Sequence, residues 1–421
     1  MKNNKNIWMY MGGRFVSLIG SGIQMIALPL YILDLTGSGT LMGVFSMLTL
    51  VPALVVAPFS GIIGDRKNRR YIMIATDIGR GGLVCFLGIT AMSGNLNIYL
   101  LFSFQIFISV MDSLFNSASA ALLPDLMSKE ELIEANSVKG GFDAASMILG
   151  PALGGVVYGI WGVKMVFFIN AVSFMISAIF STFIVYNRKV ESKVKINIKI
   201  LLNENFETLK FIVSKKGLLQ LFTFAMISNF LLVPMFDIIM PYVLKKEIGF
   251  ASEQFGYIMG FFTLGILLGN VGISVRFKKL GLKKLMKLGL IIETIFIALV
   301  CVLVLPNIVD MYKGPTFQLF ISIAICCIGI GFFNAFVNTP ISTNLQNLVP
   351  AEMRSRFFSI LGMFAQAAVP VGALLFGVLL DKMKYYNLII IVNIISILVA
   401  IMFLVKACDD AYEAKECTEK I

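Results

Sequence analysis

The sequence contains no histidine, and its six cysteines never occur at a CxxC spacing. Zinc sites are built mainly from closely spaced Cys and His ligands, so the sequence supports neither a metal centre nor a disulfide framework. No nucleophile motif or paired-acid motif is present either, which argues against a membrane-bound enzyme. We therefore expect no metal, no cofactor and no catalytic residues.

Charged residues are also scarce. They make up 14% of the 421 residues, whereas hydrophobic residues make up 58%. A soluble domain is about a quarter charged, so a soluble fold of this composition would expose too much apolar surface. The net charge of +11 could indicate a nucleic-acid partner, but the basic residues lie in short loops between apolar runs. This placement favours membrane topology, with lipids as the solvent and no nucleic acid as partner.

Long apolar runs are abundant, and each has about the 20 residues needed to cross a bilayer. The twelve runs cover residues 8–35, 40–64, 71–93, 97–123, 138–161, 163–186, 218–244, 252–275, 285–306, 316–345, 357–380 and 386–405. The predicted fold is therefore an all-α integral membrane protein with twelve transmembrane helices in two pseudo-symmetric six-helix halves.

The chain is expected to divide into four parts. These are an N-terminal half (1–186), a cytoplasmic linker (187–217), a C-terminal half (218–405) and a cytoplasmic tail (406–421). The linker has apolar residues at helical spacing, which predicts an amphipathic helix on the membrane surface; a solvated linker is the alternative. With both termini in the cytoplasm, most of the 35 Lys and Arg residues lie inside. This bias predicts a multi-pass protein of the bacterial cytoplasmic membrane.

Short segments recur in the same order in the two halves. Phe115-Asn116 is echoed by Phe333-Asn334, and Pro151 is echoed by Pro370. Duplicated halves around a site near the bilayer midplane are typical of transporters. The repeat therefore favours a transport function.

The loop after the second run contains an acidic residue followed by a basic turn, Gly61-Ile-Ile-Gly-Asp65-Arg66-Lys67-Asn68-Arg69-Arg70. Such a carboxylate can reach the N-terminus of a neighbouring helix and pair with nearby basic side chains. Asp125, at the end of the fourth run, is a candidate partner. The alternative is a basic loop that only fixes topology.

This loop resembles the signature loop of the major facilitator superfamily. Asn68 stands where the family has a turn glycine, and Asn tolerates the left-handed conformation better than most residues. The resemblance implies a cytoplasmic gate lock. Its members would be Gly61, Asp65, Arg66, Arg69, Arg70 and Asp125.

The fifth run carries Gly150-Pro151-Ala-Leu-Gly154-Gly155. Small residues let helices approach closely, and a proline within a span allows a bend. The segment is similar to a pattern that the family associates with antiporters and export, although Ser137 and Ser146 replace two upstream glycines. The resemblance therefore implies outward transport.

The nearest resemblance is to the exporter branch that includes the macrolide-efflux transporters and the enterobactin exporter. Leu35-Thr-Gly-Ser38, the loop 65–70 and Leu123-Pro-Asp125 carry it. It implies a monomer that exports an amphipathic organic compound, such as a macrolide-type drug, by alternating access coupled to protons. Export of a siderophore or movement of a lysophospholipid, with a basic cavity, is the alternative.

Ionisable residues inside spans cost about 2.5–3.5 kcal/mol and persist with a partner or a wet cavity. The candidates for proton or substrate coupling are Asp112, Asp237, Glu293, Arg14, Gln24 and Asn334. Asp112 has no arginine in its own run, where many relatives have one, so we expect protonation to neutralise it. Asp77 and Arg80 are three residues apart and are expected to pair structurally. Glu293 either takes part in coupling or faces lipid as a protonated acid.

Overall fold

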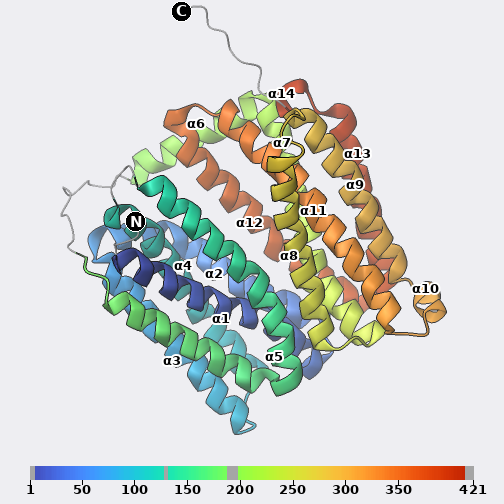
Figure 1. Cartoon of the computed structure of the whole chain (residues 1–421), viewed down its shortest axis with the longest axis horizontal. Helices are drawn as coiled ribbons and strands as arrows, with labels where there is room; N and C mark the ends of the chain where they lie inside the picture. The colour runs from blue at the N-terminus through green and yellow to red at the C-terminus, as the bar shows by residue number, and fades with distance from the viewer. Residues whose placement is uncertain (1–4, 128–130, 187–197, 413–421) are drawn as a thin grey trace, which may run out of the picture. The chain divides into compact units, whose positions relative to one another are not determined.

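The computed structural model describes residues 5–127, 131–186 and 198–412, and in these ranges the chain is helical and has no strand (Figure 1). Among these described residues, eleven helices are long and apolar enough to cross a membrane. The longest, α5 (Leu132–Thr182), has 51 residues and bends at Gly162, where φ is 72°. A left-handed backbone of this kind favours glycine. The helix thus contains the fifth and sixth predicted runs, and the predicted all-α membrane fold is confirmed.

The chain forms two compact units. Unit 1 comprises Met1–Val190, Met240–Gly260 and Ala373–Asp381, and unit 2 comprises Glu191–Ile239, Phe261–Gly372 and Lys382–Ile421. Unit 1 contains α1 (Lys5–Thr36), α2 (Gly39–Arg66), α3 (Arg69–Met92), α4 (Ile98–Leu126), α5, η2 (Tyr242–Ile248) and short parts of two further helices. The division into two halves joined by residues 187–217 stays a prediction.

Unit 2 holds most of α8 (Ser252–Val275) and of α12 (Ala351–Lys382), whose remaining residues belong to unit 1. Its other elements are α6 (Ile198–Ser214), α7 (Lys216–Pro234), η1 (Met235–Ile239), α9 (Leu282–Leu303), α10 (Pro306–Met311), α11 (Phe317–Leu348), α13 (Tyr385–Lys406) and α14 (Asp409–Tyr412). The helix α6 falls within the predicted linker, whose residues 187–197 lie outside the described ranges.

In unit 1, α1 lies between the two arms of α5 (Figure 1). The helices touch through their backbones, since a Cβ atom on Gly22 would lie 2.9 Å from the Cα of Gly150. On the other arm, a Cβ atom on Gly20 would lie 2.1 Å from the Oγ of Ser173. Small residues on the faces of α1 therefore allow the close packing of the bundle.

In unit 2, α11 packs between α8 and α9. A Cβ atom on Gly331 would lie 2.0 Å from the carbonyl oxygen of Phe262, and one on Gly289 would lie 2.8 Å from the Cβ of Phe336. The contact at Gly289 places α9 beside α11 close to the polar side chains of Glu293 and Asn334.

The seventh predicted run, residues 218–244, is less regular than expected. The α-helix α7 ends at Pro234 and continues as the π-helical segments η1 and η2. Pro234 and Pro241 have no N–H group, so each removes an α-helical hydrogen bond. Wider π-helical turns often lie at functional sites.

Candidate functional site

Part of the predicted gate lock forms in unit 1. Arg69 Nη1 lies 2.6 Å from Asp125 Oδ2, and Tyr186 donates a hydrogen bond of 2.7 Å to the same oxygen. The pair therefore links the start of α3 to the end of α4. The side chains at Gly61, Asp65 and Arg66 lie outside the described part of the structure, so their place in the lock stays a prediction.

Asn68 and Arg70, the two neighbours of Arg69, both make hydrogen bonds at the start of α3. Asn68, which stands at the family's turn glycine, has φ −68° and is not left-handed, and its side chain caps α3 by accepting from the N–H of Arg70 at 3.0 Å. Asn is a favoured N-cap residue, which explains its presence. Arg70 donates to the carbonyl oxygens of Ser181 and Thr182 at the end of α5. It thus anchors α3 to α5.

Arg14 and Asp143 join α1 to α5. The guanidinium group donates from Nε at 2.8 Å and from Nη2 at 3.1 Å to the two carboxylate oxygens, and Lys139 lies 2.9 Å from the same carboxylate. A bidentate pair of this kind has a fixed geometry. Arg14 therefore has a structural partner for its charge within unit 1.

Arg80 is the centre of a buried charged cluster. It forms ion pairs with Asp77 on its own helix and with Asp112 on α4. The expected pairing of Asp77 with Arg80 is thus present. Asp112 has no arginine on its own helix, as expected, but Arg80 of the neighbouring helix pairs with it, so protonation is not its sole means of neutralisation.

The guanidinium of Arg80 lies between two aromatic rings, at 4.3 Å from the centroids of Phe115 and of Phe174. Such stacking stabilises a desolvated cation. Within the described ranges, Asp77 Oδ2 and Arg80 Nε have no hydrogen-bond partner, whereas the Asp112 side chain is 37% exposed. The cluster therefore has two carboxylates for one cation, and one of them reaches the surface.

Gln24 points into the helix contact and is buried. Its Oε1 accepts a hydrogen bond of 2.6 Å from Asn170 Nδ2 of α5, and only 6% of the residue is exposed. Gln24 therefore has a structural partner, and its place among the coupling candidates stays a prediction. Buried amides need partners, and Gln24 finds its partner within the bundle.

Glu293 and Asn334 form the corresponding polar contact in unit 2. Asn334 Nδ2 donates to Glu293 Oε1 at 2.9 Å, and Asn338 Nδ2 donates to Asn334 Oδ1 at 2.8 Å. Glu293 is 4% exposed, so it lies inside the bundle and not in lipid. Asn338 is exposed, so this line of hydrogen bonds runs from a buried carboxyl group to the surface.

Asp237 lies on the π-helical segment η1. Its side chain is exposed, although Met235, Phe236, Ile238 and Ile239 beside it are buried. No hydrogen bond or ion pair of Asp237 occurs among the residues that the structure describes. An intramembrane carboxyl group of this kind is a functional candidate.

The glycines of the α5 motif make close helix contacts within unit 1. A Cβ atom on Gly154 would lie 2.8 Å from the carbonyl oxygen of Ile23 on α1. One on Gly155 would lie 2.6 Å from that of Ser252 and 2.7 Å from the Cα of Gly256 on α8. The motif, with Pro151 between Gly150 and Gly154, therefore packs α5 against both α1 and the start of α8.

A second charged cluster joins α1, α2 and α12, and the sequence did not predict it. Asp381 Oδ2 accepts from Ser38 Oγ at 2.6 Å and from Thr40 N at 2.9 Å, and Asp381 Oδ1 accepts from Gly39 N at 2.7 Å. This carboxylate thereby caps the N-terminus of α2 from another helix. Nearby, Lys245 forms an ion pair with Asp34. Ser38 and Asp381 are 343 residues apart, so no local signal could reveal the contact.

In the described part of the chain, no group of three or more His, Cys, Asp or Glu residues could hold a metal ion.

Comparison with known proteins finds the same family over the whole chain. The family model described as Major Facilitator Superfamily matches residues 10–238 and 222–416. Macrolide efflux protein A of Streptococcus pyogenes is 24% identical over 400 residues, with 94% of each chain covered. The Staphyloferrin A transporter of Staphylococcus aureus is 20% identical over 400 residues, again with 94% of each chain covered. The crystal structure of the nucleoside transporter NupG matches with a TM-score of 0.73 at 15% identity, covering 96% of this chain and 98% of that one.

Proposed function

This chain belongs to the Major Facilitator Superfamily of membrane transporters, and we propose that it exports amphipathic organic compounds, such as macrolide-type drugs, in exchange for protons. The family match and the apolar helices make it a multi-pass membrane protein and a transporter of small molecules. Direction, coupling ion and cargo belong to the proposal. Full-length similarity to a macrolide efflux protein supports the cargo, and the glycine motif of α5 supports outward transport.

The observation that carries the coupling is the environment of Glu293. The carboxyl group is buried within a span, and its partner there is an amide and not a cation. A carboxylate without a cation costs several kcal/mol in such a place, so the neutral acid is the less costly form. Movement of the helices that brings water to Glu293 would favour release of the proton. Because Glu293 favours the neutral form when it is buried and the ionised form when water reaches it, proton release is coupled to the movement of the helices.

The Arg80 cluster is the second place where a proton can bind. Its two carboxyl groups share one guanidinium, so full ionisation leaves one negative charge in excess. Asp112 is the more exposed of the two and is the group through which a proton can enter. Asp237 is a candidate for contact with the cargo, because its exposed carboxyl group has no partner among the described residues.

Transport proceeds by alternating access in this proposal, in a monomer with both termini in the cytoplasm. The charge bias of the loops supports this orientation. The contacts of Arg69 with Asp125 then lie at the cytoplasmic end, and those of Asp381 with α2 lie at the opposite end.

Siderophore or lysophospholipid export remains the alternative, supported by the similarity to the Staphyloferrin A transporter. An anionic cargo needs an available cation within the spans. Arg14 is bound to Asp143, and Arg80 is bound to two carboxylates. The described spans therefore favour a cargo without net negative charge.

The test is accumulation of a macrolide and of lipophilic dyes in pump-deficient bacteria that express the protein, with and without a protonophore. Exclusion should be sensitive to the protonophore and should be lost in Glu293→Gln. Glu247→Gln is the matched control, because Glu247 is an exposed acid at the end of η2. Loss of exclusion in Asp112→Asn with full activity in Glu293→Gln would move the coupling to the Arg80 cluster. No exclusion of any compound, with normal expression, would refute drug export and favour the siderophore or lipid alternative.

A further inference from the structure

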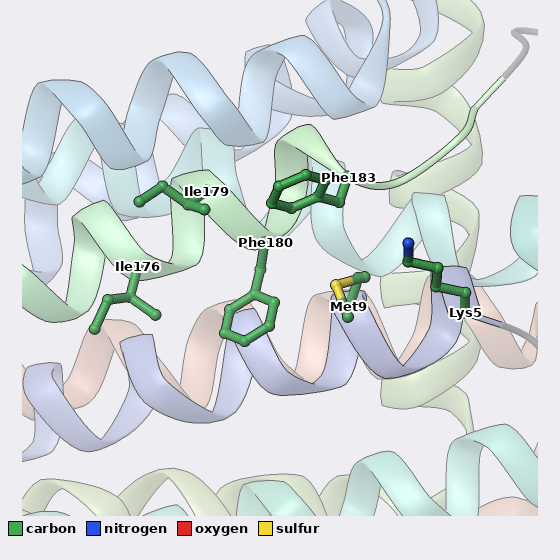
Figure 2. A pocket seen from close by; sticks show the side chains of 6 residues that line it. All are labelled: Lys5, Met9, Ile176, Ile179, Phe180 and Phe183. Carbon is green, nitrogen blue, oxygen red and sulfur yellow. The ribbon is translucent and has the colours of Figure 1, made fainter.

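A groove on unit 1 lies between the first turns of α1 and the last turns of α5 and has a volume of about 420 Å³. Its lining is apolar except for one ammonium group. The lining residues are Lys5, Met9, Ile176, Ile179, Phe180 and Phe183. Figure 2 shows the side chains of α5 in a row, with Met9 facing them and Lys5 at the end opposite Ile176.

The backbone around this groove is fixed. Asn6 and Val185 exchange two hydrogen bonds of 2.9 Å, so the start of α1 is tied to the chain just after α5. The ring of Phe180 packs over Gly12, where an added Cβ atom would lie 3.6 Å from it. The groove therefore lies between two helices that hydrogen bonds and side-chain packing hold together.

One cation, Lys5, lines the groove, and a second, Arg70, is bound to the end of α5 next to the lining residue Phe183. Lys5 is exposed and has no ion pair or hydrogen bond with any described residue. Arg70 donates to the carbonyl oxygens of Ser181 and Thr182, directly before Phe183 in the chain. Carbonyl groups orient the guanidinium but do not neutralise it, and no carboxylate pairs with Arg70 in the described ranges. The end of the groove therefore carries uncompensated positive charge.

The groove lies on a membrane protein, so its apolar part faces hydrocarbon chains. From Ile176 to Phe183 it extends about 10 Å along α5, which is about two thirds of the depth of one leaflet. An apolar groove of this length, with Lys5 at one end and Arg70 bound to the adjacent end of α5, has the chemistry to bind one lipid molecule with a negative headgroup. A zwitterionic lipid would fill the channel but would leave the positive charge unpaired.

We propose that this groove is a binding site for an anionic phospholipid, with an acyl chain along Ile176, Ile179 and Phe183 and the phosphate group at Lys5 and Arg70. None of the residues proposed for proton coupling or cargo contact lines this groove, and the proposal does not depend on the direction of transport. Because Arg70 also anchors α3 to α5, the bound lipid would hold together the ends of three helices of unit 1.

Quenching of a tryptophan by brominated lipids tests the proposal on the full-length protein in phosphatidylcholine vesicles. The natural tryptophans are replaced in Trp8→Phe and Trp161→Phe, and Phe183→Trp provides the reporter, since Phe183 is 57% exposed and tolerates the change. Brominated phosphatidylglycerol and brominated phosphatidylcholine are compared at equal fractions. A second reporter, Ile295→Trp on α9, measures the general lipid surface, because Ile295 is 52% exposed.

At Phe183→Trp, phosphatidylglycerol should bind more strongly than phosphatidylcholine, and at Ile295→Trp the two should be equal. Lys5→Gln should lower the preference about fivefold, the effect of one basic side chain at an anionic surface, and Lys5→Arg should keep it. Lys279→Gln removes the same charge from an exposed turn of unit 2 and should change nothing.

Equal binding of the two lipids at Phe183→Trp would overturn the proposal. So would a preference that Lys279→Gln lowers as much as Lys5→Gln does, because the cause would then be the overall charge. Displacement of both lipids by a macrolide, without any preference between them, would make the groove a cargo site and would also overturn it. Loss of lipid preference overturns this proposal and leaves drug exclusion in cells untouched, so the two proposals fail separately.

Discussion

Gly155 of α5 is a position where a single methyl group should disturb the packing of two helices. An added Cβ atom would lie 2.6 Å from the carbonyl oxygen of Ser252 and 2.7 Å from the Cα of Gly256, which are both backbone atoms. Ordinary contact begins at 3.4 Å, so the start of α8 must move by about 0.8 Å to accept the methyl group. Overpacking of this size costs about 1–3 kcal/mol, and alanine returns up to about 1 kcal/mol of helix propensity. We expect Gly155→Ala to lower the free energy of unfolding by about 1–2 kcal/mol.

Gly140→Ala on the same helix is the matched control. Nothing lies within 4 Å of a Cβ atom at Gly140, so alanine there should stabilise the helix by up to about 1 kcal/mol. The assay is the thermal denaturation midpoint of the purified proteins in one detergent and at one heating rate, because membrane proteins often unfold irreversibly. Gly155→Ala should melt clearly below the parent protein and Gly140→Ala at or above it. Equal midpoints for the two variants would show that the glycine motif does not pack α5 tightly, and the reasoning would be refuted.

Three further changes test other contacts. Arg80→Leu should destabilise the protein by about 3–5 kcal/mol because it leaves two carboxyl groups without their cation, and adding Asp77→Asn should recover part of the loss in the denaturation midpoint. Asp381→Ala removes three hydrogen bonds from the start of α2. Because the exposed carboxylate is partly solvated, the change should lower the free energy of unfolding by about 1–2 kcal/mol. Asp310→Ala on the exposed α10 should change it by less than about 0.5 kcal/mol. Burial raises the pKa of Tyr412 from 10.0 to about 12. The contribution of the protonated Tyr412 to the free energy of unfolding is therefore complete below pH 10 and is lost as the pH rises through about 12. Resistance of α14 to carboxypeptidase should therefore not change between about pH 7 and pH 9, and a decrease in that interval would contradict the buried position.

The spans could be predicted because hydropathy is a local property of the chain. A run such as residues 285–306 is apolar enough to cross the bilayer whatever it packs against, and α9 occupies nearly the same residues. The helix start at Asn68 was also visible, although for a different reason from the one expected. Asn caps helices through its side chain, and the loop geometry required this and not a left-handed turn.

The partners of the charged side chains could not be predicted, because they depend on the rotation of each helix. The sequence shows that Asp112 has no arginine on its own helix, but only packing brings Arg80 of α3 to it. The same limit applies to Gln24, which a rotation of half a turn would expose, and to Asp381, whose partners lie more than 300 residues away. Hydropathy gives the depth of a residue in the bilayer and carries no information about its facing side.

In each sequence half, the third and fourth helices hold carboxyl groups within the spans, and the two halves give these groups different partners. The repeat pairs Phe115-Asn116 of α4 with Phe333-Asn334 of α11, and in both halves a carboxyl group lies near this segment. In the first half, one guanidinium balances two carboxyl groups, and in the second an amide meets a single one. Each half is therefore short of one positive charge. One bound proton in each half would remove the deficit, whereas a proton in one half alone would leave a buried negative charge in the other. Under the proposed proton coupling, Asp112→Asn alone and Glu293→Gln alone should therefore each impair transport. The double variant should still bind the cargo, and a protonophore should not change its cargo accumulation.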